Sequence, residues 1–227
     1  MATTQILRLA LCAIAVSTMA CASAIDQRGA TAAHSLTASS ALTALTPAQH
    51  RAVLSGQIVT VPMVQEDDDS RYTGGVSHLL VNAPADALFA TLSQPDVLQR
   101  VLPRTKRATL LSDRQRSRTV ELVQGNRLVE ATYTVTLVQR PVAQDGTYRV
   151  DFKLDRTRPH DVEDLWGSFS LTPVDEGRCV VSTAAFVDLG SSFAVLFEGK
   201  IQDLILSTPW HVKRYVDETR LVSAGAR

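Results

Sequence analysis

The chain has 227 residues, of which 45% are hydrophobic and 20% are charged. This composition is ordinary for a globular protein, and the length suits one domain with a sizeable core. The 23 Lys and Arg residues equal the 23 Asp and Glu residues in number. The chain therefore has no overall positive field, and we expect no nucleic-acid partner.

Residues 1–24 are typical of a secretory signal peptide. Arg8 precedes an apolar run from Leu9 to Met19, and Ala22-Ser23-Ala24 gives the small-x-small pattern that a signal peptidase recognises. The run is shorter than the about 20 residues that span a bilayer. We therefore predict export to the periplasm or secretion, with no transmembrane segment in the mature chain. A buried N-terminal helix and a lipid anchor at Cys21, which would make the protein a membrane-anchored lipoprotein, remain alternatives.

The predicted cleavage leaves one thiol in the mature chain. Cys12 and Cys21 belong to the N-terminal segment, and Cys179 lies in an apolar, strand-like run. A single cysteine cannot form an internal disulfide. We expect Cys179 to be a buried and unreactive thiol rather than a nucleophile.

Two segments precede the main domain. Residues 25–45 are rich in Ala, Ser and Thr and are predicted to be a flexible linker. Residues 46–72 are predicted to be a helix–strand extension. Thr46-Pro47-Ala48-Gln49 matches a capping box, so a helix should begin there, run to about Ser55 and end at Gly56. A short strand should follow at Gln57–Pro62, and then a solvated acidic loop at 66–69.

The main domain, 73–223, should open with a strand and two short helices. The strand is predicted at Gly75–Val81, and the helices are predicted at Pro84–Ser93 and Asp96–Val101, bounded by Pro95 and Pro103. Alternating apolar and polar residues then predict antiparallel strands at Arg107–Asp113, Arg118–Gln124, Val129–Leu137, Tyr148–Leu154, Leu165–Pro173 and Arg178–Val187. We expect Gly125-Asn126 to form a two-residue hairpin turn.

The C-terminal segment is predicted to be helical. Apolar residues recur at three- and four-residue steps from Phe197 to Val216. Pro209 must kink or break the helix. Because the apolar stripe keeps its phase across Pro209, we predict one long kinked helix, with two separate helices as the alternative.

These elements predict an α+β helix-grip fold. A curved antiparallel sheet of about six to seven strands would wrap around the long C-terminal helix, with the two short helices after the first strand walling a cavity. The sequence resembles the START-like superfamily, also described as the polyketide cyclase/dehydrase, Bet v 1-like or SRPBCC group. The resemblance rests on Val81–Phe89, on Gly167–Pro173 followed by Gly177, and on the amphipathic C-terminal helix. The extension resembles one found in exported bacterial members.

The inner faces of the predicted strands hold no His, Asp, Glu, Lys or Cys. The residues that we expect to line a ligand cavity are Val129, Tyr133, Val135, Val150, Phe152, Phe169, Phe197, Ile201 and Leu204. Tyr133 could orient a ligand through its hydroxyl, as could Trp210 near the helix kink, but a Tyr packed in the core with a local partner is the competing interpretation. The same residues could also fill the interior completely.

No catalytic or metal-binding pattern stands out. His78 and His211 are isolated, and His160 lies among Asp161, Glu163 and Asp164 in a loop, where solvent exposure fits better than metal binding. We predict no catalytic residue, no metal and no cofactor. An exported protein that binds a small hydrophobic molecule, such as a lipid, isoprenoid or quinone, is the favoured function, and enzymatic activity is disfavoured without being excluded. A cyclase/aromatase-like enzyme and an interaction module with a filled cavity are the alternatives.

Overall fold

The structure, a computed structural model, describes residues 42–67, 70–127, 130–190 and 193–225. The chain divides into two units, Met1–Leu36 and Thr37–Arg227, and all described residues lie in the second. The predicted signal peptide, most of the predicted linker and Cys21 lie outside the described residues and stay predictions. Within the described ranges, no helix combines the length and the apolar character needed to cross a membrane.

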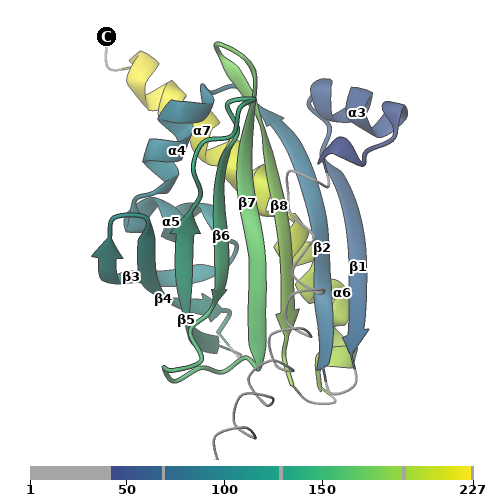
Figure 1. The fold of residues 1–227 in the computed structure, drawn as a ribbon, viewed down its shortest axis with the longest axis vertical. Helices are drawn as coiled ribbons and strands as arrows, with labels where there is room; N and C mark the ends of the chain where they lie inside the picture. Colours follow the sequence, from purple (N-terminus) through teal and green to yellow (C-terminus); the bar gives the residue numbers. More distant parts are fainter. Residues whose placement is uncertain (1–41, 68–69, 128–129, 191–192, 226–227) are drawn as a thin grey trace, which may run out of the picture. The chain divides into compact units, whose positions relative to one another are not determined.

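The described residues form one antiparallel sheet of eight strands, in the order β1-β2-β8-β7-β6-β5-β4-β3 (Figure 1). The strands are β1 (Val59–Asp67), β2 (Ser70–Val81), β3 (Thr105–Arg114), β4 (Ser117–Gly125), β5 (Glu130–Gln139), β6 (Tyr148–Leu154), β7 (Asp164–Asp175) and β8 (Arg178–Asp188). Strands β3 to β8 form the predicted meander, and β2 closes against β8. The helix-grip fold expected from the sequence is confirmed.

The strand count differs from the prediction because the N-terminal extension joins the sheet. Strand β1 pairs with β2 from Val59↔His78 to Asp67↔Ser70, and the two make an antiparallel hairpin. The acidic residues Glu66 and Asp67, predicted in a loop, therefore belong to the end of β1. Charged side chains suit this position because β1 is an edge strand, where one side of the backbone stays unpaired.

Helix α3 (Pro47–Leu54) begins as the sequence predicts. The side chain of Thr46 accepts a hydrogen bond from the backbone N–H of Gln49, and the Gln49 side chain caps the backbone of Thr46 in return. Val53 of this helix packs with Leu80 and Val180. These residues belong to the face of the sheet opposite the C-terminal helices, so α3 covers part of that outer face.

The predicted hairpin turn at Gly125-Asn126 is wrong. Gly125 still pairs with Glu130, so it ends β4 and the loop begins only at Asn126. The backbone of Gly125 has φ 145°, a value that glycine adopts at little cost at the end of a strand. A Gly-Asn pair signals local backbone freedom, but pairing across the two strands decides where the turn begins.

The two short helices follow β2 as predicted. Helix α4 (Ala85–Leu92) and helix α5 (Pro95–Val101) are separated by Ser93 and Gln94. Pro95 stands at the first position of α5, where its missing N–H costs nothing. Both helices bury apolar residues against β2, β7 and β8, in a cluster that also holds Val212 and Val216.

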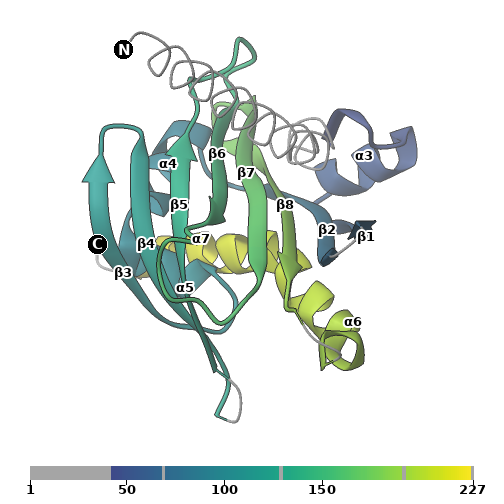
Figure 2. The same cartoon turned by 60° about the horizontal axis from the view of Figure 1, so that its bottom comes forward.

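The C-terminal segment consists of two helices, which was the alternative to one long kinked helix. Helix α6 (Phe193–Leu206) ends before Ser207, and helix α7 (Thr208–Gly225) begins after it. Pro209 lacks the N–H that would continue the helical hydrogen bonds, so the break falls beside it. The Ser207 hydroxyl donates to the Leu204 carbonyl oxygen, and that of Thr208 to the Ile205 carbonyl oxygen. In Figure 2 the strands curve around α7, which runs along their concave side.

Candidate functional site

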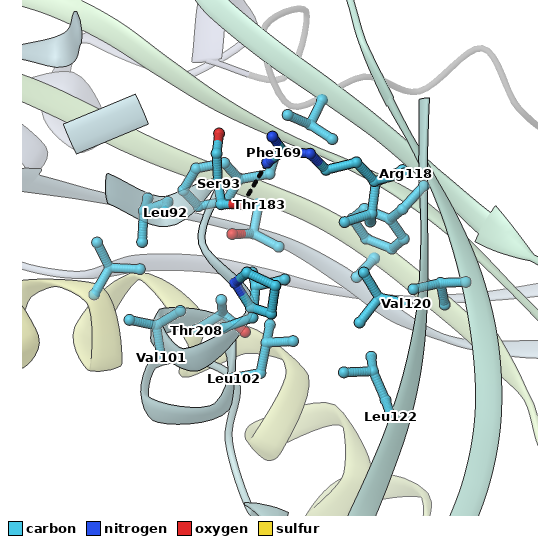
Figure 3. A pocket seen from close by; sticks show the side chains of 18 of the residues that line it. Leu92, Ser93, Val101, Leu102, Arg118, Val120, Leu122, Phe169, Thr183 and Thr208 are labelled. Atoms are coloured by element: carbon cyan, nitrogen blue, oxygen red, sulfur yellow. Dashed lines mark hydrogen bonds between the residues drawn. The ribbon is translucent and has the colours of Figure 1, made fainter. Parts of the chain in front are cut away.

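A cavity of about 200 Å³ lies between the concave face of the sheet and the helices α4, α5, α6 and α7 (Figure 3). We call that concave face the inner face. The described residues that line the cavity are Phe89, Leu92, Ser93, Pro95, Leu98, Val101, Leu102, Pro103, Leu110, Arg118, Val120, Leu122, Gln124, Tyr133, Val135, Leu137, Gln139, Val150, Phe152, Leu165, Phe169, Thr183, Ala185, Leu204, Ile205, Thr208 and Val212. Most of these side chains are apolar.

Strand register explains which side chains form the sheet wall. Residues paired across antiparallel strands point to the same face, so each row of pairs crosses the cavity wall. One row runs through Arg118, Leu137, Phe152, Gly167 and Ala185. Gly167 is required in this row, because an added Cβ there would lie 2.2 Å from the Ala184 backbone oxygen and 2.4 Å from the Phe152 ring. The glycine therefore leaves the space that the ring of Phe152 occupies.

The cavity brings together six of the residues that the sequence analysis placed at a ligand site, namely Tyr133, Val135, Val150, Phe152, Phe169 and Leu204. Ile201 does not line the cavity and packs instead at the edge of the apolar cluster around Val120 and Val135. Val129 and the side chain of Phe197 lie outside what the structure describes. Whether these residues hold a ligand stays a prediction.

Tyr133 lies at one end of the cavity and is only 6% exposed. Its hydroxyl donates to the side-chain oxygen of Gln124. The Gln124 amide in turn donates to the Pro103 carbonyl oxygen at 3.2 Å and to the Thr105 hydroxyl oxygen at 2.8 Å. Burial raises the pKa of Tyr133, so the phenol stays protonated. The hydroxyl has a local partner, which is the interpretation that competed with ligand orientation.

Arg118 also lies on the cavity wall, on β4. It precedes Leu122 by four residues, so the two residues are about 13 Å apart along the strand. Its Nε donates to Asp113 Oδ1 at 3.0 Å, and one Nη donates to the Ser93 carbonyl oxygen (Figure 3). The Ser93 hydroxyl also lies 3.4 Å from the side-chain nitrogen of Gln139. The Arg118 side chain is 27% exposed. This end of the cavity is therefore polar and in contact with solvent.

Thr183 adds one more polar atom to the cavity wall. The residue is 5% exposed, and its hydroxyl has no hydrogen-bond partner among the described residues. It pairs with Phe169 across β8 and β7, which places it on the inner face. A buried hydroxyl without a partner costs free energy in an empty cavity.

Arg118 and Gln124 were not among the predicted site residues, although the sequence carried the signal. The predicted inner face of β4 contained Val120 and Leu122, and strand side chains alternate with a period of two. Continuing that alternation by one step in each direction reaches Arg118 and Gln124. They were missed because they are the first and last residues of the predicted strand and are polar, whereas the inner face was assigned from its apolar residues.

None of the described lining residues can act as a carboxylate, imidazole, amine or thiol base. His78 is fully buried on the outer face, with its Nδ1 2.8 Å from the Ser182 hydroxyl, and burial lowers its pKa to about 4. Cys179 is buried outside the cavity lining, and burial raises its thiol pKa to about 12. Trp210, considered as an anchor, is 46% exposed and does not line the cavity.

The loop around His160 places that side chain in solvent. His160 is exposed, and its Nδ1 lies 2.7 Å from the Arg158 carbonyl oxygen. In the part of the chain that the structure describes, no group of three or more His, Cys, Asp or Glu side chains is placed to hold a metal ion. Nearby Asp164 instead accepts from the Tyr72 hydroxyl at 2.7 Å and pairs with Arg156 at 2.8 Å.

Residues 76–207 match the model of a protein family described as polyketide cyclase / dehydrase and lipid transport. That match covers more than half of the chain. The chain belongs to this family. The resemblance to the START-like and Bet v 1-like superfamily drawn from the sequence is thereby confirmed. No curated protein sequence gives a significant match to the chain.

Solved structures with the same fold have low sequence identity to this chain. A STAR-related lipid transfer protein from Xanthomonas axonopodis is 12% identical, with a TM-score of 0.55 over 69% of this chain and 98% of that one. The human StarD13 lipid transfer and protein localization domain is 8% identical, with a TM-score of 0.51 over 74% of this chain and 93% of that one. At such identities the likeness establishes the fold alone.

Proposed function

We propose that this protein binds a small hydrophobic molecule in the cavity between the inner face and the helices. The observation that carries the proposal is the apolar cavity itself, which combines about 200 Å³ of space with one charged lining residue, Arg118, among those described. An apolar cavity of roughly 150 Å³ accepts benzene, so the space here suits a ring system or a chain segment. Burying about 200 Å² of apolar ligand surface would contribute about 5 kcal/mol before association costs.

The family description favours a lipid-like ligand. It includes lipid transport, and the Xanthomonas and human structures are named as lipid transfer proteins or domains. The same description includes cyclases and dehydrases, which need an acid or base beside the reacting carbon. Tyr133 is engaged with Gln124 and stays protonated, and no other lining residue among those described supplies such a group. Binding without chemistry is therefore the better supported function.

We also propose that the protein works outside the cytoplasm. This rests on the signal-peptide pattern at 1–24 alone. Cell fractionation with N-terminal sequencing of the mature protein tests it. An N-terminus at Ile25 supports free export, whereas a lipid-modified Cys21 supports the anchored form, and a cytoplasmic protein that keeps Met1 contradicts both.

The cavity proposal is tested by native mass spectrometry of the purified protein, followed by denaturation and extraction. We expect a small hydrophobic adduct that is released when the protein unfolds. A parallel assay uses the neutral fluorescent probe N-phenyl-1-naphthylamine, whose emission rises in apolar surroundings. Probe binding with a dissociation constant in about the micromolar range supports an open cavity.

A matched pair of variants separates the cavity from the protein surface. Val150→Trp places a bulky ring into the cavity from β6, and we expect it to abolish probe binding. Val142→Trp makes the same exchange at a loop residue that is 53% exposed, and it should leave binding unchanged. If the probe binds neither the parent nor Val142→Trp, the interior is filled and the binding function is wrong.

A further inference from the structure

Among the described residues that line the cavity, one has a charged side chain, and that side chain lies where the cavity meets solvent. Arg118 lines the cavity and is 27% exposed. Leu110, on the neighbouring edge strand β3, also lines the cavity and is 38% exposed. The opening of the cavity therefore lies along β3 and β4, beside Arg118.

Some of the hydrogen-bond donors of Arg118 are not used within the described residues. Its Nε is engaged by Asp113 and one Nη by the Ser93 carbonyl oxygen, whereas the second Nη has no hydrogen-bond partner among the described residues. A guanidinium is always charged, and it forms strong, directional hydrogen bonds with carboxylates. No acidic side chain among the described residues lines the cavity to occupy it from inside. Asp113 competes from outside, but its side chain is 44% exposed, so the pair is screened by solvent.

The far end of the cavity offers no comparable site. Tyr133 donates to Gln124, and the Gln124 amide donates to Pro103 and Thr105. Between Arg118 and this end, the wall consists of apolar residues such as Val120, Leu122 and Val135. The arrangement suits a molecule with one polar end at Arg118 and an apolar body directed toward Tyr133.

We propose that the ligand is a small amphipathic carboxylate, with its carboxylate bound by Arg118 at the opening and its apolar tail in the cavity. This inference rests on the proposed binding function and names the ligand class for the same cavity. The limited volume favours a single chain or ring system over a two-chain lipid. The carboxylate would remain at the rim, where solvent still reaches it, so the cost of burying its charge is small.

The test compares two probes that share a tail and differ in the head group: decanoate and decan-1-ol. Each displaces N-phenyl-1-naphthylamine from the purified full chain at about pH 8, where the carboxyl group is ionised. We expect decanoate to bind at least about tenfold more tightly than decan-1-ol, as a charged hydrogen bond implies. Arg118→Gln should weaken decanoate binding by about tenfold and change decan-1-ol binding by less than about threefold.

Two further variants test whether the loss of decanoate affinity in Arg118→Gln could come from a change in the fold. Arg116→Gln removes an exposed arginine of the β3–β4 turn that does not line the cavity, and it should leave both affinities unchanged. Asp113→Asn removes the carboxylate that competes for Arg118, so decanoate should bind roughly threefold more tightly while decan-1-ol stays unchanged. If Arg118→Gln fails to fold, the Asp113→Asn result decides in its place.

The outcomes separate the two proposals. Equal binding of decanoate and decan-1-ol by the parent protein overturns the carboxylate inference and leaves the hydrophobic cavity standing. An equal loss of both affinities in Arg118→Gln also overturns it, because the arginine would then only support the fold. If the fluorescent probe itself does not bind, the binding function fails, and the carboxylate inference fails with it.

Discussion

The two ends of the cavity contain similar polar groups but differ in how those groups are used. At one end, Tyr133 and Gln124 hydrogen-bond to each other and to the chain at Pro103 and Thr105. At the other end, Arg118 bonds to Asp113 and Ser93 and keeps donors free among the described residues. A polar side chain in a cavity therefore indicates a binding site only when its hydrogen bonds remain unfilled.

The neighbouring elements cause this difference. The segment after α5 brings the Pro103 carbonyl and Thr105 against Gln124, so the side-chain oxygen and the amide of Gln124 are hydrogen-bonded within the protein. Beside Arg118, the acceptors that the described residues offer are the Ser93 carbonyl oxygen, just after α4, and the exposed carboxylate of Asp113. A carbonyl at a helix end has no partner within its helix, so it takes the arginine as its donor. The remaining donors of Arg118 can then bind a ligand.

A charge placed on the apolar part of the cavity wall should have the largest effect. Phe152→Asp puts a carboxylate where the ring of Phe152 now fills the space beside Gly167. We expect N-phenyl-1-naphthylamine affinity to fall by about 100-fold or more, because the ligand would face an unpaired charge. Lys153→Asp, on the exposed next residue that points to the outer face, is the matched control.

Circular dichroism spectra of both variants show whether the fold survives the exchange. The wall assignment fails if folded Phe152→Asp binds the probe as tightly as the parent protein does. Weaker binding in Lys153→Asp would place the ligand elsewhere on the sheet.

Much of this fold follows from local sequence patterns. Alternation with period two identified β3 to β8 and the inner-face positions of Tyr133, Val150 and Phe169, because one face of each strand is buried. The capping box at Thr46 located the start of α3. The extent of β1 was missed, since its second half carries acidic residues and forms a strand only through pairing with β2.

The candidate site was predictable in part for the same reason. The apolar wall follows from alternation, but the use of each polar group depends on contacts between distant segments. Ser93 and Arg118 lie 25 residues apart in the chain and meet only because the sheet curls toward α4. The partner of Tyr133 likewise comes from another strand. Which hydrogen bonds each polar side chain makes could therefore be seen only in the structure.

At the Tyr133 end of the cavity, Tyr133→Phe should alter stability more than binding. Removing the hydroxyl leaves the half-buried Gln124 oxygen without its donor, which should lower the free energy of unfolding by about 1 kcal/mol. Decanoate affinity should change by less than about threefold, because the hydroxyl is engaged within the protein. Urea unfolding and probe displacement measure the two effects. A large loss of affinity without loss of stability would instead make Tyr133 a direct ligand contact.

The same variant also gives a pH test of the burial of Tyr133. Burial raises the pKa of Tyr133 above the value of about 10 found in unfolded chains. The parent protein therefore loses stability as the pH rises above about 10, because only the unfolded phenol ionises readily. Tyr133→Phe lacks this loss, so the stability deficit of the variant should shrink across that range. A deficit that stays constant from about pH 8 to pH 11 would mean that the phenol is not shielded from solvent.

The smallest effect is expected at Thr183. Among the described lining residues, its hydroxyl differs from the polar groups at both cavity ends, because it is neither hydrogen-bonded within the protein nor open to solvent. It bonds to no described residue, and it is not exposed enough to be fully hydrated. Thr183→Val keeps the shape and removes the hydroxyl, so the empty protein should gain about 1 kcal/mol in unfolding free energy. Decanoate affinity should stay constant, because we place the carboxylate at Arg118. A variant that is less stable than the parent would show that the Thr183 hydroxyl has a partner, and a selective loss of decanoate affinity would move the head group from the opening into the cavity.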